Sequence, residues 1–422
     1  TFNPDTVALI IFDSFLLIAS IILFKYMIRF NTNSLFIKTT PPDAYLKPSW
    51  MISVVTALFL IFLGGSVIIF LIKSINTPHG YFDAIVGWNM RARFLFRGGE
   101  LWETVFSIFT TYPLLIPGTI ARIWYYIGSD TTIVPIIVAF LFTFSTVGLL
   151  YSSVSILRGR SQGVLAGLLL LSTVIFLQSG MNQVGDVPVG FFYLATIVLF
   201  YLNDNISTGE KGFMLILAGI TTGLASWTKA EGNLLMVSIV VASTLIFLPK
   251  KGFKKYIKDL LIWGIGLIPI LAVVIYFKTQ ITSPSYITDQ GWTGIIDKLA
   301  DPTRYLIITQ IMVEKLVAFG DGVLFLLALY LILMGKKYII RDDIITFSII
   351  VLCFMLIGYF SIYLITPVEL SFHVQVSFKR LFLQLWPTII FVSFMIVKPP
   401  IIINDCSVAE NMDKLVSVKN QC

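Results

Sequence analysis

Eleven stretches of this chain are apolar and long enough, or nearly long enough, to cross a lipid bilayer as helices. A spanning helix needs about 20 mainly apolar residues. Of the 422 residues, 57% are hydrophobic and only 13% are charged, whereas about 25% of residues in soluble domains are charged. A soluble enzyme and a disordered chain are therefore excluded. The predicted spans are residues 7–28, 52–73, 131–153, 163–181, 187–203, 212–227, 232–248, 260–277, 320–335, 344–366 and 382–398.

The predicted fold is an all-α, polytopic transmembrane helical bundle of about 11–13 helices. We expect residues 1–50 to form an N-terminal helix and a cytoplasmic loop. Residues 51–398 would form the main transmembrane module, and residues 399–422 a short cytoplasmic tail. Residues 112–127 are also apolar but contain two prolines and an arginine, so we predict that they dip into the membrane without crossing it.

Cysteines, histidines and net charge exclude several further classes. The three cysteines lie far apart and there are only two histidines, which supports neither a disulfide framework nor a zinc cluster. No cofactor is predicted, although a divalent metal ion is left open. The formal net charge of +7 indicates loops that face anionic membrane lipids, and nucleic acid is not an expected partner.

Lysine and arginine in short loops predict the orientation of the bundle. The clearest cytoplasmic marker is the run PKKGFKKYIK at residues 249–258. With this run inside, strict alternation puts Asp83 and Asp186 on the same outer face, provided that residues 112–127 do not fully cross. The predicted outer loops are residues 74–130, 182–186, 228–231, 278–319 and 367–381.

The first outer loop contains an amphipathic segment at residues 84–97. Three residues fall on one helical face and three polar residues repeat on another. We expect this helix to lie in the membrane interface with its rings at headgroup depth, either as a cap on the bundle or with Arg93 binding a phosphate. The apolar face carries Trp88, Ala92 and Leu95, and the polar face carries Asn89, Arg93 and Arg97.

Acids and cations collect at the predicted outer ends of the helices. Asp83 follows the second span, and Asp186 lies in GDVPVGFF at the start of another. Each has an ordinary structural interpretation, as a solvated acid at the membrane edge and as a helix N-cap, respectively. The other members are Lys229 and Glu231 in the turn WTKAEGN, and His373, Lys379 and Arg380 before the last span.

The cations also have structural interpretations, as snorkelling or interfacial anchors. As a set, however, these residues suit transfer from a phosphate-linked donor. A carboxylate can take the proton of an acceptor hydroxyl, and cations can stabilise the leaving phosphate. The loop at residues 278–319, with Tyr286, Asp289 and Trp292, is predicted to be flexible, either as a lid over such a site or as a plain surface loop.

Taken in order, five strings resemble the GT-C superfamily of polytopic glycosyltransferases. The branch is that of the protein O-mannosyltransferases and the lipid A aminoarabinose transferase. The resemblance spans roughly residues 50–398 and lies in the order and spacing of the set. The strings are YFDAIVGWNMRARFLFRGGELW, YPLLIPGTIARIWYYIG, GDVPVGFF, GLASWTKAEG and FKRLFLQLWP.

The resemblance implies a polyprenyl-phosphate donor carrying a hexose or a pentose. The acceptor would be a glycan, a lipid or a protein at the outer face of the plasma (inner) membrane. Asp83 matches the catalytic base and Asp186 the second acidic position, which orients acceptor or metal. Lys229 matches a lysine near the donor phosphate, and Arg380 a basic residue near the last helix.

The sequence departs from this family at one position. Relatives often carry an acid just before the Tyr-Pro string, and here the residue is Thr111, which weakens the inference of a metal site. A catalytically silent subunit that scaffolds a membrane complex therefore stays an alternative. A lipid or solute transporter is a second one, although no internal repeat supports it.

Overall fold

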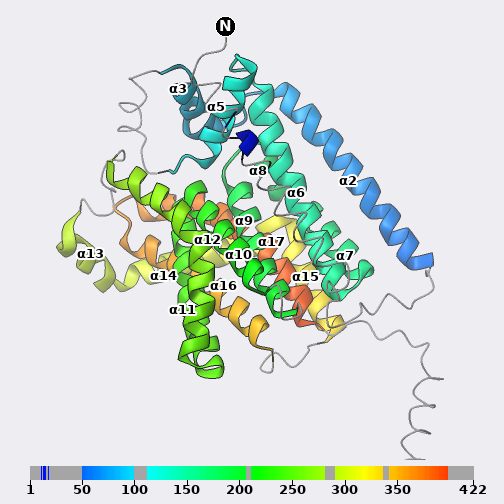
Figure 1. Cartoon of the computed structure of the whole chain (residues 1–422), viewed down its shortest axis with the longest axis vertical. Coiled ribbons are helices and arrows are strands. Elements are labelled where there is room, and N and C mark those ends of the chain that lie inside the picture. Colours follow the sequence, from blue (N-terminus) through cyan, green and yellow to red (C-terminus); the bar gives the residue numbers. More distant parts are fainter. Residues whose placement is uncertain are drawn as a thin grey trace, which may run out of the picture.

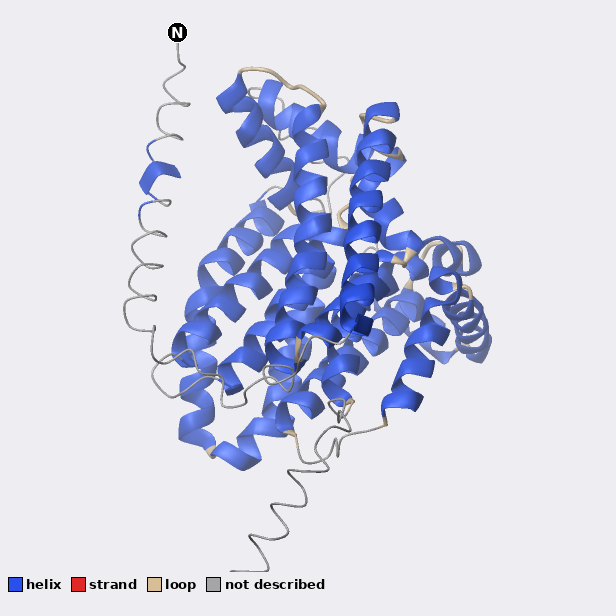
Figure 2. Ribbon diagram, turned by 90° about the vertical axis from the view of Figure 1, so that its right-hand side faces the viewer, coloured by secondary structure: helices blue, strands red, loops and turns tan. Residues whose placement is uncertain are grey.

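The computed structural model describes residues 11, 13–15, 18, 50–98, 112–205, 211–280, 290–335 and 342–397. The regular elements in these ranges are helices (Figure 2). Most of the predicted first span, Thr111 and the predicted tail lie outside the described residues. The elements are α2 (Trp50–Asn76), η2 (Ala84–Asn89), α3 (Met90–Arg97), α5 (Leu115–Ile127), α6 (Ile133–Arg158), α7 (Arg160–Leu171), α8 (Val174–Met181), α9 (Asp186–Asn205), α10 (Lys211–Thr228), α11 (Glu231–Lys251), α12 (Phe253–Gln280), α13 (Gly291–Ala300), α14 (Pro302–Val317), η4 (Phe319–Gly322), α15 (Val323–Met334), α16 (Asp343–Ile365) and α17 (Leu370–Ile396).

Among the described residues, seven helices are long and apolar enough to cross a membrane. Two bent pairs, α7 with α8 at 65° and α14 with η4 and α15 at 46°, bring the number to nine if each pair is one span. The helix predicted at 212–227 is α10, which is apolar but shorter than a full span. The chain is thus a multi-pass membrane protein, and its described part is an all-helical bundle.

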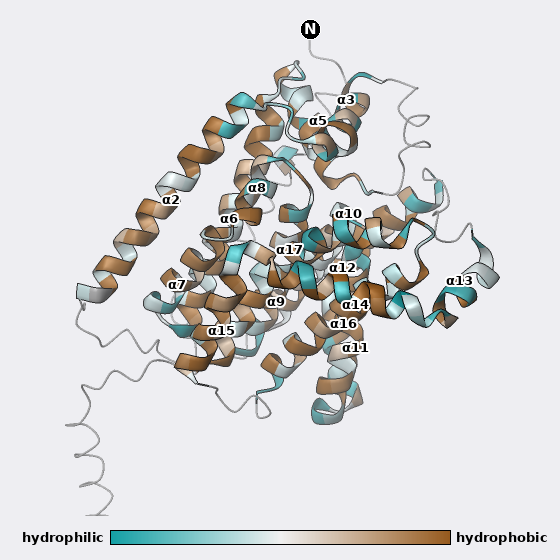
Figure 3. Cartoon of the chain, turned by 180° about the vertical axis from the view of Figure 1, so that it is seen from behind, coloured by the Kyte–Doolittle hydropathy of each residue, from teal (hydrophilic) through white to brown (hydrophobic). Residues whose placement is uncertain are grey.

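Two helices form the centre of the bundle. Of the apolar windows of α9 and α17, 78% and 72% are buried, compared with 17% for α2. Accordingly, α2 runs along the outside and presents mostly hydrophobic side chains (Figures 1 and 3).

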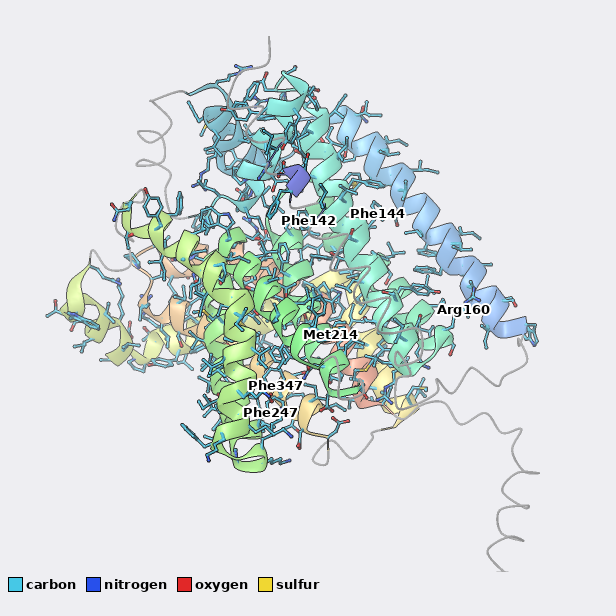
Figure 4. All side chains as sticks on the ribbon, in the orientation of Figure 1. Phe142, Phe144, Arg160, Met214, Phe247 and Phe347 are labelled. Carbon is cyan, nitrogen blue, oxygen red and sulfur yellow. The ribbon has the colours of Figure 1, made fainter. Side chains whose placement is uncertain are left out.

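Aromatic contacts join the outer helices to each other and to the centre (Figure 4). Phe247 of α11 lies 5.3 Å from Phe347 of α16, and Phe142 of α6 lies 5.7 Å from Phe192 of α9, between ring centroids.

The polar contacts at the two ends of the bundle agree with the predicted alternation of the helices. At one end, Lys250 pairs with Asp343, and Arg158 donates to the backbone oxygen of Met395. We call this the lysine end, because it also carries the basic turn between α11 and α12. The end of α2 and the starts of α9 and α11 lie at the opposite end, with Asp83.

Helices α3 and α5 lie together at this opposite end of the molecule (Figure 1). The amphipathic segment forms a π-helical turn, η2, followed by α3. The tryptophan of this segment is not on an exposed face: Trp88 is 3% exposed, and its ring packs against Tyr112 and the backbone at Gly185. The ring is buried because α5 covers it, which a helical-wheel pattern does not reveal.

Two other predicted outer loops contain helix. Residues 291–300 and 302–317 form α13 and α14, and α14 begins where the Asp301 side chain accepts from the Thr303 N–H at 2.9 Å. Trp292 lies on α13 and is 81% exposed, whereas Tyr286 and Asp289 lie outside the described residues. Helix α17 begins at residue 370 instead of 382, because Glu369 caps it by accepting from two backbone N–H groups.

Glycines allow α10 and α12 to approach each other closely. A Cβ atom at Gly219 would lie 2.0 Å from the backbone oxygen of Trp263, and one at Gly266 would lie 2.0 Å from that of Ile216. Small residues at helix interfaces let backbones pack tightly where lipid offers no hydrophobic driving force. These contacts fix α10, whose end carries the turn with Lys229.

We predict that Gly219→Ala lowers the thermal unfolding temperature of the purified protein. The added methyl group would meet backbone and force the two helices apart, which costs about 1–3 kcal/mol. Gly148→Ala is the matched control, because nothing lies within 4 Å of a Cβ atom there and alanine is favoured over glycine in a helix. Equal unfolding temperatures for the two variants would contradict this account.

Candidate functional site

Five charged side chains from distant parts of the chain meet where the central helices begin. Asp83 directly precedes η2, and Asp186 is the first residue of α9. Lys229 lies in the turn between α10 and α11, Glu231 is the first residue of α11, and Arg380 lies in α17. All five were predicted as site residues from the sequence, and ion pairs connect them in the structure. We call these five residues the charge cluster.

The segment before Asp83 is tied to the turn that precedes α9. The Tyr81 N–H donates to the Asn182 backbone oxygen at 3.2 Å, and the Gln183 amide donates to that of Pro78 at 3.1 Å. Gly80 has a φ of +74°, and a Cβ atom there would lie 2.7 Å from the Asn182 oxygen. Glycine is therefore required for this approach, which brings Asp83 beside the head of α9.

Asp186 is the hub of the charge cluster and has no exposed surface. Its Oδ1 accepts from Lys229 Nζ and from Gln384 Nε2, both at 2.8 Å. Its Oδ2 lies 2.9 Å from both Nε and NH2 of Arg380. An ionised carboxylate has about four lone-pair sites, so Asp186 is saturated. It holds the cations in place and has no position left for a substrate proton.

Arg380 connects the buried acid to an open one. Besides its two contacts with Asp186, its NH1 donates to Oδ2 of Asp83. The Asp83 side chain is 38% exposed and that of Arg380 33%. Asp83 is therefore the carboxylate of this bridge that a second molecule can reach from outside.

Lys229 is almost completely buried between two acids. Its Nζ lies 2.8 Å from Asp186 and 3.0 Å from Oε1 of Glu231, and it lies 5.6 Å from the centroid of the Tyr112 ring. Burial alone would lower the pKa of Lys229, but the two carboxylates, Asp186 first, raise it above that of an ordinary lysine. The ammonium therefore stays charged across the physiological range.

Sequence reasoning missed the neutral residues of the site. Gln384 is fully buried, donates to Asp186 and, at 3.4 Å, to Glu231, and accepts from the Tyr359 hydroxyl at 3.2 Å. Its position was detectable, because it is a lone amide four residues after Arg380 in an apolar run, hence on the same helical face. Tyr112 lies in a string that was singled out, but its contact with Lys229 has no sequence signal.

Two predicted site residues lie apart from the charge cluster. Arg93 pairs with Asp130 at 3.3 Å and lies 3.4 Å from Nδ1 of His79. His373 Nδ1 lies 2.9 Å from the Thr366 hydroxyl, and its ring packs edge-on against a tyrosine. None of these contacts is to a member of the charge cluster.

The donor set of the site does not suit a resident metal ion. Within the described ranges, no group of three His, Cys, Asp or Glu side chains could hold one. The oxygens of Asp186 are all used by nitrogen donors, and Lys229 and Arg380 already neutralise the neighbouring carboxylates. The arrangement instead suits an anion next to the two cations and a proton acceptor at Asp83.

Fold and site together define a class of protein: a multi-pass helical bundle with acids and cations gathered where its central helices begin. A model of the dolichyl-phosphate-mannose-protein mannosyltransferase family matches residues 113–276, which include Asp186, Lys229 and Glu231. This match supports membership of the GT-C superfamily of membrane glycosyltransferases, to which the sequence strings also point. Neither a curated protein nor a solved structure matches the chain.

We predict opposite effects on stability for the two aspartates of the bridge. Asp186→Asn leaves Lys229 and Arg380 short of their shared counter-ion, and breaking a buried pair in this way costs about 3–5 kcal/mol. Asp83→Asn removes one contact of a half-exposed pair and should shift stability by about 1 kcal/mol or less. Thermal unfolding of both variants in the same detergent checks this, and equal losses would contradict the assignment of Asp186 as the hub.

Proposed function

We propose that the chain transfers a sugar from a polyprenyl-phosphate donor to an acceptor at the outer face of the plasma (inner) membrane. Asp83 is the general base, and Lys229 and Arg380 bind the donor phosphate. The sugar is a hexose or a pentose, and the acceptor is a glycan, a lipid or a protein. The matched family's name, with its dolichyl-phosphate-mannose donor, supports a lipid-phosphate sugar.

The observation that carries this proposal is the bridge through Arg380. One guanidinium contacts a buried acid and an open acid, with a buried ammonium 2.8 Å from the first acid. Guanidinium groups match phosphate oxygens in geometry and charge. A donor phosphate held here would place the sugar beside Asp83, the acid of the bridge that is accessible.

The reaction balances with these groups. An acceptor oxygen attacks the anomeric carbon of the sugar while the bond from that carbon to the phosphate oxygen breaks. The acceptor proton passes to Asp83, and the polyprenyl phosphate leaves with the bonding electrons. Lys229 and Arg380 stabilise the charge that develops on this phosphate.

The distribution of charged residues along the bundle supports the proposal that the reaction takes place at the outer face of the membrane. The basic turn with Lys250 and Lys251 is at the lysine end, and the charge cluster is at the opposite end of the bundle. Lysine-rich short loops favour the cytoplasmic side. With the lysine end inside, the charge cluster faces outward, where lipid-linked sugars would meet their acceptors.

The two bent spans do not favour a transporter. Broken helices in transporters leave backbone groups free to bind a substrate. Here aromatic side chains fill the breaks: Phe319 of η4 packs against Phe382 and Trp386 of α17, and the Trp386 indole donates to the Thr173 hydroxyl at 2.9 Å. The breaks are therefore packed against α17 by these side chains.

We predict that Asp83→Asn lowers sugar transfer by about 10²–10⁴-fold, the range for removal of a general base. The measurement uses the full chain in proteoliposomes with labelled polyprenyl-phosphate hexoses and pentoses. Membranes from cells that lack the chain supply the acceptor, and transferred label is counted.

Asp130→Asn is the matched control, because Asp130 pairs with Arg93 and Arg97 outside the charge cluster. Its transfer should stay near that of the unaltered chain. Equal transfer by Asp83→Asn and the unaltered chain would reject Asp83 as the base. No transfer from any donor by the unaltered chain would favour a silent scaffold subunit.

A further inference from the structure

Arg380 divides its N–H groups between two acids that differ in access to solvent. Nε and NH2 contact Asp186, which has no exposed surface, and NH1 contacts Asp83, which is 38% exposed. Leaving Asp186 would strand two opposite charges in the interior, which is strongly unfavourable. The contact with Asp83 is partly exposed to solvent, and such a pair contributes little to stability. The NH1 side of the guanidinium is therefore the side that can exchange partners.

The contact with Arg380 engages the carboxylate of Asp83, which the proposed reaction needs as its base. Asp83 Oδ2 accepts from Arg380, and this contact keeps the carboxylate turned towards the guanidinium instead of towards an acceptor hydroxyl. The other two acids are not substitutes. Asp186 is saturated, and Glu231 is held by Lys229 and faces the Gln384 amide. In this structure, therefore, Arg380 of the charge cluster binds Asp83, the residue proposed as the general base.

A phosphate oxygen is a stronger competitor for NH1 than a single carboxylate oxygen. It brings charge and further acceptor oxygens to the same place, and Lys229 lies on the other side of Asp186 to attract it. Once displaced, Asp83 is an unpaired carboxylate next to an anion.

We propose that the phosphate of the donor lipid displaces Asp83 from Arg380, so that Asp83 becomes an available base only when the donor is bound. This inference rests on the proposed function and adds a binding order to it, with donor before acceptor. Because Asp186 keeps its hold on the other side of the guanidinium, Arg380 changes one partner without leaving the site.

The test measures how accessible the Asp83 carboxylate is to a carbodiimide with an amine nucleophile. The full chain in nanodiscs is labelled alone, with a polyprenyl monophosphate, or with the uncharged polyprenol of the same length. Mass spectrometry of the peptides gives the labelling rate at Asp83. Asp297 on α13 is the reference carboxylate, because it is exposed and distant in the chain from the charge cluster. Native mass spectrometry of the same samples reports whether the lipid binds.

We expect the polyprenyl monophosphate to raise the labelling rate at Asp83 several-fold and to leave Asp297 unchanged. Polyprenol should change neither, because it has no phosphate to compete for Arg380. Inorganic phosphate distinguishes a lipid headgroup from a free anion, since an effect of the ion alone at millimolar concentration would assign the switch to phosphate from any source.

Arg380→Lys separates charge from the shape of the guanidinium. A single ammonium at this position cannot contact both acids in the way that the guanidinium does, and we expect it to stay with the buried Asp186. Labelling at Asp83 should then be high without lipid and should not respond to polyprenyl monophosphate. A variant that still responds as the unaltered chain does would overturn the role of the bridge.

The outcomes separate this inference from the proposed function. Binding of the polyprenyl monophosphate without any change at Asp83 overturns the displacement and leaves the donor site standing. Absence of binding overturns the donor site and, with it, the displacement. Binding with a several-fold rise at Asp83 that Arg380→Lys abolishes supports both.

Discussion

The charge of Asp186 is the constraint on which the rest of this structure depends. An ionised carboxylate with no exposed surface is tolerated only when its lone pairs are filled and its charge is paired. Here the partners come from two other parts of the chain, the turn between α10 and α11 and the third turn of α17. Satisfying one acid therefore brings α9, α11 and α17 together at one end. The close approach of α10 and α12 at their glycines sets where the lysine of that turn can reach.

The same arrangement gives Asp186 and Asp83 different roles. Asp186 is fixed by four donors, whereas Asp83 has one partner and remains partly open. Gln384 adds to the fixed side, because its amide touches two like-charged acids and is itself held by Tyr359. A site built in this way is rigid where the donor phosphate would bind and adaptable where a proton would move, which is the combination that group transfer from a charged donor needs.

Hydropathy predicted seven of the spans in the described part of the chain because the signal is local to each helix, but it did not reveal the bends within the two helix pairs. The charged members of the cluster could be predicted as well, since acids and cations at the ends of apolar segments are conspicuous. The positions of Arg93 and His373 could not, because nothing in their spacing shows that nearer partners, Asp130 and Thr366, would take them. The early start of α17 also escaped, because its first turns are polar enough to read as loop. Gln384 was detectable, as a lone amide four residues after Arg380 in an apolar run, whereas the contact of Tyr112 with Lys229 corresponds to no single-sequence pattern.

Because ion pairs hold both the fold and the site, loss of activity is ambiguous for most of these residues. Replacing Asp186, Lys229 or Arg380 leaves an uncompensated charge within the charge cluster, so an inactive variant could simply be a poorly folded one. Asp83 differs, because its single contact is half-exposed and its loss leaves Arg380 paired with Asp186. It is the member of the charge cluster at which chemistry can be separated from stability. The roles of the buried members then follow from what each does to Asp83, through proton availability and response to phosphate.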